Sequence, residues 1–151
     1  MVAKYLVAVD GSSHGWKALD LAVDLAAQRH AGLVILHVVR HEPVPDGLER
    51  FAEVEGIRKD ELAARYEAGG RMGAGILREA EIRARSAKID GVESRTEEGD
   101  PASQIALVAR QVHAEMIFIG SRGLNDAAGL LMGSVSHKVL HLARCTCVAV
   151  R

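Results

Sequence analysis

One segment in the C-terminal third of the chain carries residue types suited to holding an anion. Gly120 and Gly123 have two residues between them, and Gly133 follows after nine more, with Ser134 next to it. Glycine lets backbone N–H groups approach phosphate oxygens, and a helix N-terminus adds about half a positive charge. Ser134 and Ser136 can each add a hydroxyl. A turn before a helix capped by Ser134 would explain one glycine pair, but the full spacing favours a phosphate site.

Asp10 is the second candidate for ligand binding. It follows the apolar run of residues 5–9 and precedes Gly11. If that run is a strand, Asp10 lies at the carboxyl edge of a sheet, where a carboxylate can accept hydrogen bonds from two ribose hydroxyls. Asp-Gly is also a common turn former, and alone it would predict only a turn. Together with the glycine motif, it favours ribose binding.

Metal binding is the alternative chemistry that the sequence offers. His137 and His141 lie four residues apart in a predicted helix, and Cys145 and Cys147 follow. Imidazoles and thiolates at this spacing can ligate zinc. The helix lacks the glutamate of a metalloprotease, so a solvated helix face and two buried cysteines is the simpler interpretation.

Other catalytic arrangements find little support. His14 could approach phosphates from the start of a predicted helix, whereas His37 lies in a predicted buried strand and is expected to be a hydrogen-bonded core histidine. The sequence contains no G-x4-G-K-[S/T] and no S-G-G loop after the first strand. The last absence argues against the adenylate-forming pyrophosphatases.

The elements that must position these residues alternate between strand and helix. Short apolar runs, typical of buried strands, are separated by stretches with apolar residues every three or four positions. This alternation predicts a parallel sheet covered by helices on both faces, with ligands bound beyond the carboxyl ends of the strands. The expected strands are residues 5–9, 33–39, 92–98, 116–119 and 147–150, and the last helix is expected at about 134–142.

Local chemistry predicts several boundaries. Ala31-Gly32 is expected to close the first helix, and Asp100 to cap a later helix with Pro101 in its first turn. The polar strand 92–98 is expected at a sheet edge. Residues 48–88 are expected to form one or two helices, an exposed face or a mobile cover over the ligand, interrupted by Gly69, Gly70, Gly73 and Gly75.

Composition limits the class of protein. The 151 residues suit one domain, and 19 Lys+Arg against 20 Asp+Glu give a net charge of −1. This charge argues against a diffuse basic field for nucleic acid, and an aromatic content of 3% argues against base-stacking platforms. No apolar run reaches 18 residues and no secretory signal is evident, so we expect no membrane span and a cytoplasmic location with reduced thiols.

These motifs resemble those of a known family, the universal stress proteins, and in particular its ATP-binding branch. That branch carries G-x2-G-x9-G-[S/T], which Gly120, Gly123, Gly133 and Ser134 match. The likeness extends over both ends of the chain, and only residues 41–90 are unspecific. Further matching segments are residues 5–12, 36–38 and 129–136.

The resemblance implies a fold and a ligand. The fold would be a Rossmann-like, five-stranded parallel sheet in the order 3-2-1-4-5 with helices on both faces, forming one domain over residues 1–151. ATP would place its ribose at Asp10, its adenine in an aliphatic slot near Val9 and the backbone of Val38, and its phosphates on the glycine motif. The full set of expected contacts is Val9, Asp10, Val38, Gly120, Arg122, Gly123, Gly133, Ser134, Val135 and Ser136.

The chain departs from the family pattern at two places. The spacer of residues 124–132 holds Asp126 and no Lys or Arg, which leaves Arg122 as the cation expected nearby and makes Mg2+ plausible as a co-ligand. Thr146 stands where family members usually have a proline, which is expected to change the entry into the last strand rather than the site.

Three functions remain open on this basis. The first is an ATP-binding stress-response or signalling module with slow or no hydrolysis, whose occupancy a downstream protein reads. The second is a slow Mg-dependent ATPase or phosphotransferase assisted by Ser134 or His14. The third is a metal or redox protein. The apolar last strand, Cys147 to Val150, would leave an exposed edge unless it pairs with its symmetry mate, so a homodimer is expected, as the resemblance also implies.

Overall fold

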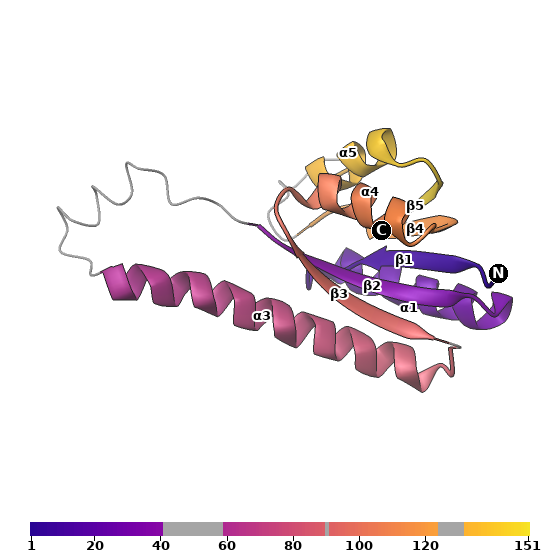
Figure 1. The fold of residues 1–151 in the computed structure, drawn as a ribbon, viewed down its shortest axis with the longest axis horizontal. Coiled ribbons are helices and arrows are strands. Elements are labelled where there is room, and N and C mark those ends of the chain that lie inside the picture. Colours follow the sequence, from indigo (N-terminus) through magenta and orange to yellow (C-terminus); the bar gives the residue numbers. More distant parts are fainter. Residues whose placement is uncertain (41–58, 90, 124–131) are drawn as a thin grey trace.

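A computed structural model describes residues 1–40, 59–89, 91–123 and 132–151, with the side chains of α3 described from residue 72 onward. Strands and helices alternate along the chain (Figure 1). The strands are β1 Lys4–Ala8, β2 Gly32–Val39, β3 Val92–Glu98, β4 Met116–Gly120 and β5 Thr146–Val150. The helices are α1 Ser13–Arg29, α3 Lys59–Ser86, α4 Pro101–Gln111 and α5 Ser134–Leu142.

The five strands form one sheet in the order β3-β2-β1-β4-β5. All four neighbouring pairs are parallel, so the carboxyl ends of the strands lie at one edge. The expected fold is confirmed, including the polar strand β3 at one edge and β5 at the other. The chain order changes direction between β1 and β4, which is where ligands bind in open parallel sheets.

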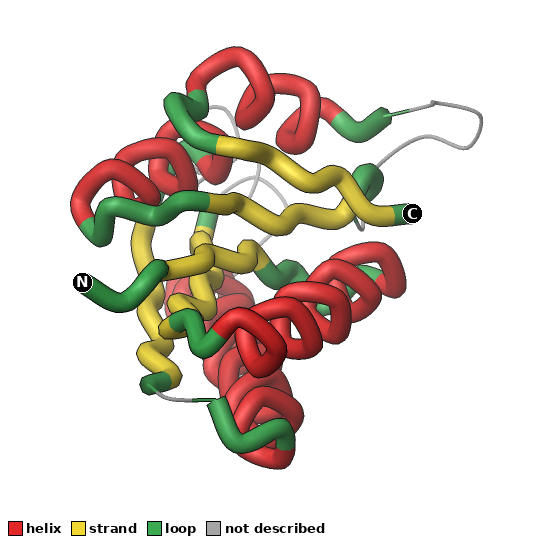
Figure 2. Tube along the Cα trace, turned by 90° about the vertical axis from the view of Figure 1, so that its right-hand side faces the viewer, coloured by secondary structure: helices red, strands yellow, loops and turns green. Residues whose placement is uncertain are grey.

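Helices cover both faces of the sheet (Figure 2). Alternate residues of a strand point to opposite faces, so Tyr5 and Val7 pack with buried residues of α1 and α3, whereas Leu6 packs with those of α4 and α5. Phe118, which is 1% exposed, belongs to the same core as Tyr5 and Val7, between the sheet and helices α1 and α3. Its ring centroid lies 5.8 Å from that of Tyr5. Two cores therefore fix the strand ends that carry the candidate site.

The start of α4 follows the predicted chemistry, but the end of α1 does not. Ser12 caps α1 by accepting from Gly15 N–H, and Asp100 caps α4, with Pro101 in its first turn. We expected Ala31-Gly32 to close α1, but the residue in the left-handed region is His30, at φ 52°. Histidine is among the residues enriched in that region, and the Ala31 N–H completes the ending by donating to Ala26 O.

The expectation that glycines interrupt the segment before β3 is wrong. α3 continues for 28 residues through all four of them. One reason is packing: Gly73 is buried, and a Cβ there would lie 2.7 Å from His37 Nε2 on β2. The glycine lets the helix approach the sheet closely. The expected helix over residues 48–58 lies outside the described residues.

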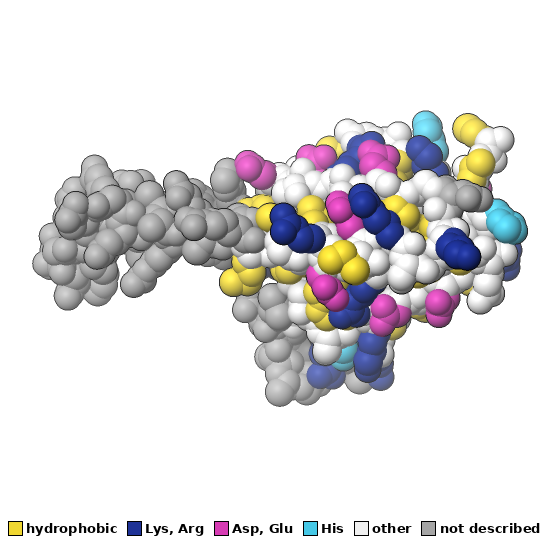
Figure 3. All heavy atoms as spheres, turned by 90° about the horizontal axis from the view of Figure 1, so that it is seen from below, with side chains coloured by type: hydrophobic (Ala, Val, Ile, Leu, Met, Phe, Trp, Pro, Cys, Tyr) yellow, Lys and Arg dark blue, Asp and Glu magenta, His cyan; other side chains and the backbone are white. Residues whose placement is uncertain are grey.

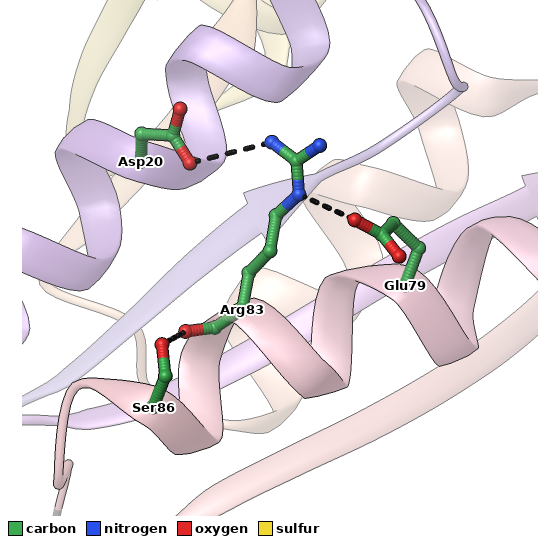
Figure 4. Close-up of polar contacts among 4 residues, drawn as sticks. All are labelled: Asp20, Glu79, Arg83 and Ser86. Atoms are coloured by element: carbon green, nitrogen blue, oxygen red, sulfur yellow. Dashed lines mark hydrogen bonds and ion pairs between the residues drawn. The ribbon is translucent and has the colours of Figure 1, made fainter.

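A cluster around Arg83 joins α3 to α1 (Figure 4). The Arg83 guanidinium lies 2.9 Å from Glu79 on its own helix and 3.6 Å from Asp20 on α1. Its central carbon also lies 4.6 Å from the ring centroid of Trp16. The hydrogen bond to Glu79, followed by the charge of Asp20, raises the pKa of Arg83 above its ordinary value, so the cation persists.

The surface shows no large field of one sign on the face drawn in Figure 3, where basic and acidic side chains are interspersed. Within the described part of the chain, no helix is long and apolar enough to cross a membrane.

Candidate functional site

The carboxyl ends of β1, β2 and β4 bring the predicted site segments together. Ser12, after β1, donates to the carbonyl of Arg122, after β4, at 3.4 Å. His14 Nδ1 lies 3.0 Å from Ser121 Oγ. His37 Nδ1, on β2, lies 2.8 Å from the carbonyl oxygen of Val9. Segments more than a hundred residues apart in sequence therefore meet at one place, as the sheet topology predicts.

Asp10 forms the turn that the sequence also allowed. Its Oδ1 accepts from Ser12 N–H at 2.9 Å and from Ser12 Oγ at 2.5 Å. Gly15 leaves room for this carboxylate, because a Cβ at Gly15 would lie 2.8 Å from Asp10 Oδ1. Among the described residues, Oδ2 accepts no hydrogen bond. The turn thus fixes one oxygen of Asp10 and leaves the other without a hydrogen bond among these residues.

Ser121 ties the two ends of the glycine motif together. It is 2% exposed, and its carbonyl accepts from Gly133 N–H at 2.5 Å and from Ser136 Oγ at 3.0 Å. Its own N–H donates to Val150 O at 2.7 Å. We expected Ser136 to offer its hydroxyl to phosphate. The residue is buried, and its hydroxyl instead donates to the carbonyl oxygens of Ser121 and Gly133. Its hydroxyl therefore shapes the motif.

The first turn of α5 differs from those of α1 and α4. Ser12 and Asp100 cap those helices with side-chain oxygens, whereas the N-cap of α5 is Gly133, which has no side chain to cap the first turn. The sequence allowed Ser134 as the cap, but the helix begins at Ser134 itself. The first N–H groups of a helix need acceptors from outside it. A bound anion can supply them.

Val9 and Val38 have different backbone surroundings. The Val9 N–H donates to Leu36 O, and its carbonyl lies against His37 Nδ1, so both groups are engaged. Successive residues of a strand direct their backbone N–H and C=O groups to opposite sides, so those of Val38 point to the same side as Leu36 O. On that side β1 has already ended at Ala8. No backbone group of the described residues pairs with Val38 on that side. Val9 thus has only its side chain to offer to the site, whereas Val38 keeps its backbone N–H and C=O on that side.

A cleft of about 530 Å³ runs from the first turn of α5 to the ends of β2 and β3. Ser134 and Val135 lie on one side of it. The sequence pointed to Arg122 as the nearby cation, and this was incomplete because Arg40 and Lys138 also line the cleft. Arg40 directly follows β2 in sequence. Because ligands bind beyond the carboxyl ends of parallel strands, this position could have identified Arg40 as a candidate. The remaining lining residues are Gly99, Asp100, Pro101 and Ala102.

Charges in the cleft are partly balanced. Lys138 Nζ lies 3.2 Å from Asp100 Oδ1, across the gap between α5 and α4. The hydroxyl of Ser103, followed by its backbone N–H, lowers the pKa of Asp100 below its ordinary value. Arg40 makes no ion pair among the described residues. Within the described part of the chain, it lines the cleft without a paired carboxylate.

Gly120 has a structural reason that the motif did not reveal. A Cβ there would lie 2.7 Å from Gly15 N and 2.8 Å from the carbonyl carbon of His14. The glycine therefore lets α1 dock against the end of β4 and places His14 beside Ser121. Gly123 and Arg122 are half-buried next to it. The predictions for residues 124–131, including Asp126, lie outside the described residues.

The four candidate metal ligands do not gather into one cluster. His137 and His141 are exposed on α5, whereas both cysteines are free thiols packed partly against the α4/α5 core. Burial raises the pKa of both thiols, which disfavours thiolate. Within the described residues, no three His, Cys, Asp or Glu side chains converge on a common point. A zinc site built from all four residues is not supported.

The whole chain matches one protein family. The universal stress protein family matches over residues 1–151. The chain belongs to this family. A universal stress protein of Bacillus subtilis is 37% identical over 154 residues, and one of Thermus aquaticus is 33% identical over 152, with both chains covered in full.

Solved structures of universal stress proteins share the fold. The protein from Lactobacillus plantarum superposes with a TM-score of 0.82 at 22% identity, covering 99% of this chain and 97% of its own. A universal stress protein solved in complex with cAMP gives a TM-score of 0.68 at 26% identity, covering 99% and 96%. Another, from Archaeoglobus fulgidus in complex with dAMP, gives 0.65 at 21%, covering 100% and 98%.

Proposed function

We propose that this universal stress protein binds ATP as a signalling module and hydrolyses it slowly or not at all. The observation that carries the proposal is the first turn of α5, which has no side-chain cap, begins at the glycine motif and lines a cleft. Such N–H groups suit phosphate oxygens. The related protein solved with cAMP supports an adenine nucleotide as the ligand class.

The remaining groups can divide the nucleotide between them. Asp10 Oδ2 would accept from the ribose hydroxyls, while Oδ1 stays in its turn. The backbone of Val38 would pair with the adenine edge, beside the buried side chain of Val9. Gly120, Arg122, Gly123, Gly133, Ser134, Val135 and Ser136 would form or line the phosphate end.

A magnesium ion is a reasonable companion of the triphosphate. Mg2+ usually takes one or two carboxylates together with phosphate oxygens and water. Phosphate oxygens and water would supply its ligands here, because the open oxygen of Asp10 is assigned to the ribose. The cation would offset charge that Arg122 and Arg40 cannot balance alone.

Signalling requires a surface that a partner reads, and we propose that a homodimer supplies part of it. β5 lies at the edge of the sheet, and its last residues are apolar and half-buried. Pairing two such edges about a two-fold axis would cover both. We expect the dimer in the cytoplasm, with a downstream protein as its reader.

Calorimetric titration of nucleotide-free protein with Mg-ATP tests the ligand. Gly133→Val should weaken binding at least tenfold, because a branched side chain blocks the approach of phosphate to the first turn of α5. Gly133 has φ −72°, so valine is not excluded by the backbone there. Unchanged affinity of Gly133→Val would refute the phosphate assignment.

Two controls sharpen this experiment. Gly75→Val changes another glycine whose Cβ would meet nothing within 4 Å, and it should bind ATP like the wild type. Phosphate release followed over hours separates a binding module from a slow ATPase. Release that continues through many turnovers, and that His14→Ala abolishes, would favour the enzyme.

A further inference from the structure

Two histidines on α5 remain once the four-ligand zinc site is set aside. His137 and His141 are both exposed, one helical turn apart, with His137 after the first turn of α5 and His141 in its last turn. Their ring centroids are 4.8 Å apart and the ring planes are inclined at 69°. Neither imidazole has a hydrogen-bond partner among the described residues. The pair is separate from the cleft, whose lining from α5 is Ser134, Val135 and Lys138.

The separation of the rings suits two ligands of one metal ion. A divalent ion sits about 2.0–2.1 Å from an imidazole nitrogen, and thus about 3.1 Å from the ring centroid. Neighbouring coordination positions at roughly 90–110° then place two centroids about 4.5–5 Å apart. The observed 4.8 Å falls in this range. Both rings are exposed, so rotation about their side-chain torsions can direct one nitrogen of each ring to a common point.

The surroundings do not oppose a cation. Lys138, next to His137 in sequence, is directed to Asp100 of the α4 cap, with Nζ 3.2 Å from Oδ1. His141 lies in the last turn of α5, where the helix dipole favours positive charge. Solvent can complete the coordination, because both rings are exposed.

We propose that His137 and His141 form a two-histidine surface site for a divalent transition-metal ion. Imidazole suits Zn2+, Ni2+ and Cu2+, whereas Mg2+ prefers oxygen ligands. The site holds the ion with two protein ligands and water, independently of the nucleotide. It stabilises the folded chain, because the two rings are held at this spacing only while α5 is helical.

Calorimetry with nucleotide-free, tag-free protein tests the proposal, using ZnCl2, NiCl2, CuCl2 and MgCl2 in turn. Cu2+ should bind more tightly than Ni2+ and Zn2+, and Mg2+ should not bind. At a metal concentration about 100 times the dissociation constant, the melting temperature should rise by about 5–10 °C. His137→Gln and His141→Gln should each weaken binding at least tenfold and abolish this rise.

Matched variants separate the pair from other histidines. His141→Gln combined with Leu142→His keeps the number of imidazoles but places them five residues apart, on different sides of the helix, and should bind as weakly as His141→Gln alone. His30→Asn removes an exposed histidine elsewhere, in a left-handed position that asparagine tolerates, and should bind metal like the wild type. Wild-type affinity in either single Gln variant, or in the shifted variant, would overturn the proposal.

Discussion

Gly73 and Gly75 lie on the same helix but face different surroundings. A Cβ at Gly73 would lie 2.7 Å from His37 Nε2, whereas one at Gly75 would meet nothing within 4 Å. The His37 ring can retreat only by giving up its 2.8 Å contact with Val9 O. Close packing therefore leaves no room for a larger residue at Gly73. At Gly75, a residue with higher helix propensity can stabilise the fold.

Alanine substitutions at these glycines should therefore have opposite signs. Gly75→Ala should raise the free energy of unfolding by about 0.5–1 kcal/mol, because alanine loses less backbone entropy than glycine. Gly73→Ala should lower it by about 1–3 kcal/mol through overpacking against His37. Urea unfolding of the two variants measures both values. A stabilised Gly73→Ala would show that the ring yields and that α3 does not depend on this contact.

At the residue scale, sequence identified chemistry better than contacts. The caps Ser12 and Asp100 were predictable, because each hydroxyl or carboxylate stands directly before an apolar helical stripe. Ser136 was predicted as a phosphate ligand, yet its hydroxyl is spent inside the motif. Gly120 has a packing reason that the motif did not reveal, because a Cβ there would meet the backbone of α1. Such outcomes depend on which helix packs against which strand, and no local pattern encodes that.

At the element scale, Arg83 shows how one side chain couples two helices. It contacts Glu79 of α3 and Asp20 and Trp16 of α1. Arg85, two residues later, pairs with Glu81 at 3.8 Å and with no other carboxylate among the described residues, and its side chain is 75% exposed. Exposed ion pairs contribute little individually, whereas a shared guanidinium over an aromatic ring contributes more.

Arg83→Gln should lower the free energy of unfolding by about 1 kcal/mol, or about 2–4 °C in melting temperature. Arg85→Gln should change it by less than about 0.5 kcal/mol. Thermal unfolding at low salt and in 1 M NaCl measures both. Salt should narrow the difference without removing it, since the Trp16 packing remains. Equal effects of the two variants would show that the bridge between α1 and α3 contributes nothing.

Element boundaries were predictable where one residue decides them. Pro101 and Asp100 fix the start of α4 locally, and the structure confirms it. The length of α3 was not predictable, because the packing of the helix on β2 and β3 outweighs the helix-weakening effect of its glycines. α1 ends earlier than the expected Ala31-Gly32, with His30 as its C-cap, because Gly32 is already part of β2.

At the scale of the whole molecule, the two sheet edges differ in chemistry. β3 is mostly polar and has no fully buried residue, with Glu93, Thr96 and Glu98 exposed, which suits an edge facing water. β5 has four consecutive half-buried apolar residues. No strand of the described residues pairs with its outer side. The strand order was predicted through family likeness rather than from periodicity, because alternation alone leaves several parallel orders open.

The orientation of β5 allows a selective test of the proposed dimer. Val150 O accepts from Ser121 N–H, so the backbone groups of Val150 face β4. Alternation then turns the N–H and C=O of Ala149 toward the open edge. Ala149→Pro removes an outward donor and spares the β4–β5 ladder, and proline is tolerated at sheet edges. A charge at Val148 would be less selective, because that side chain packs against the α1/α3 core.

Sedimentation equilibrium should find the wild type and Ala149→Ser as dimers, because both keep the outward N–H. Ala149→Pro should be a monomer, or its dimer should have a dissociation constant at least tenfold higher. In an antiparallel pair about a two-fold axis the same N–H of both protomers takes part, so the substitution removes two donors from the interface. Its melting temperature extrapolated to low concentration should stay close to that of a dissociated wild type. A dimeric Ala149→Pro would place the contact on another surface, and a monomeric wild type would leave the β5 edge without this partner.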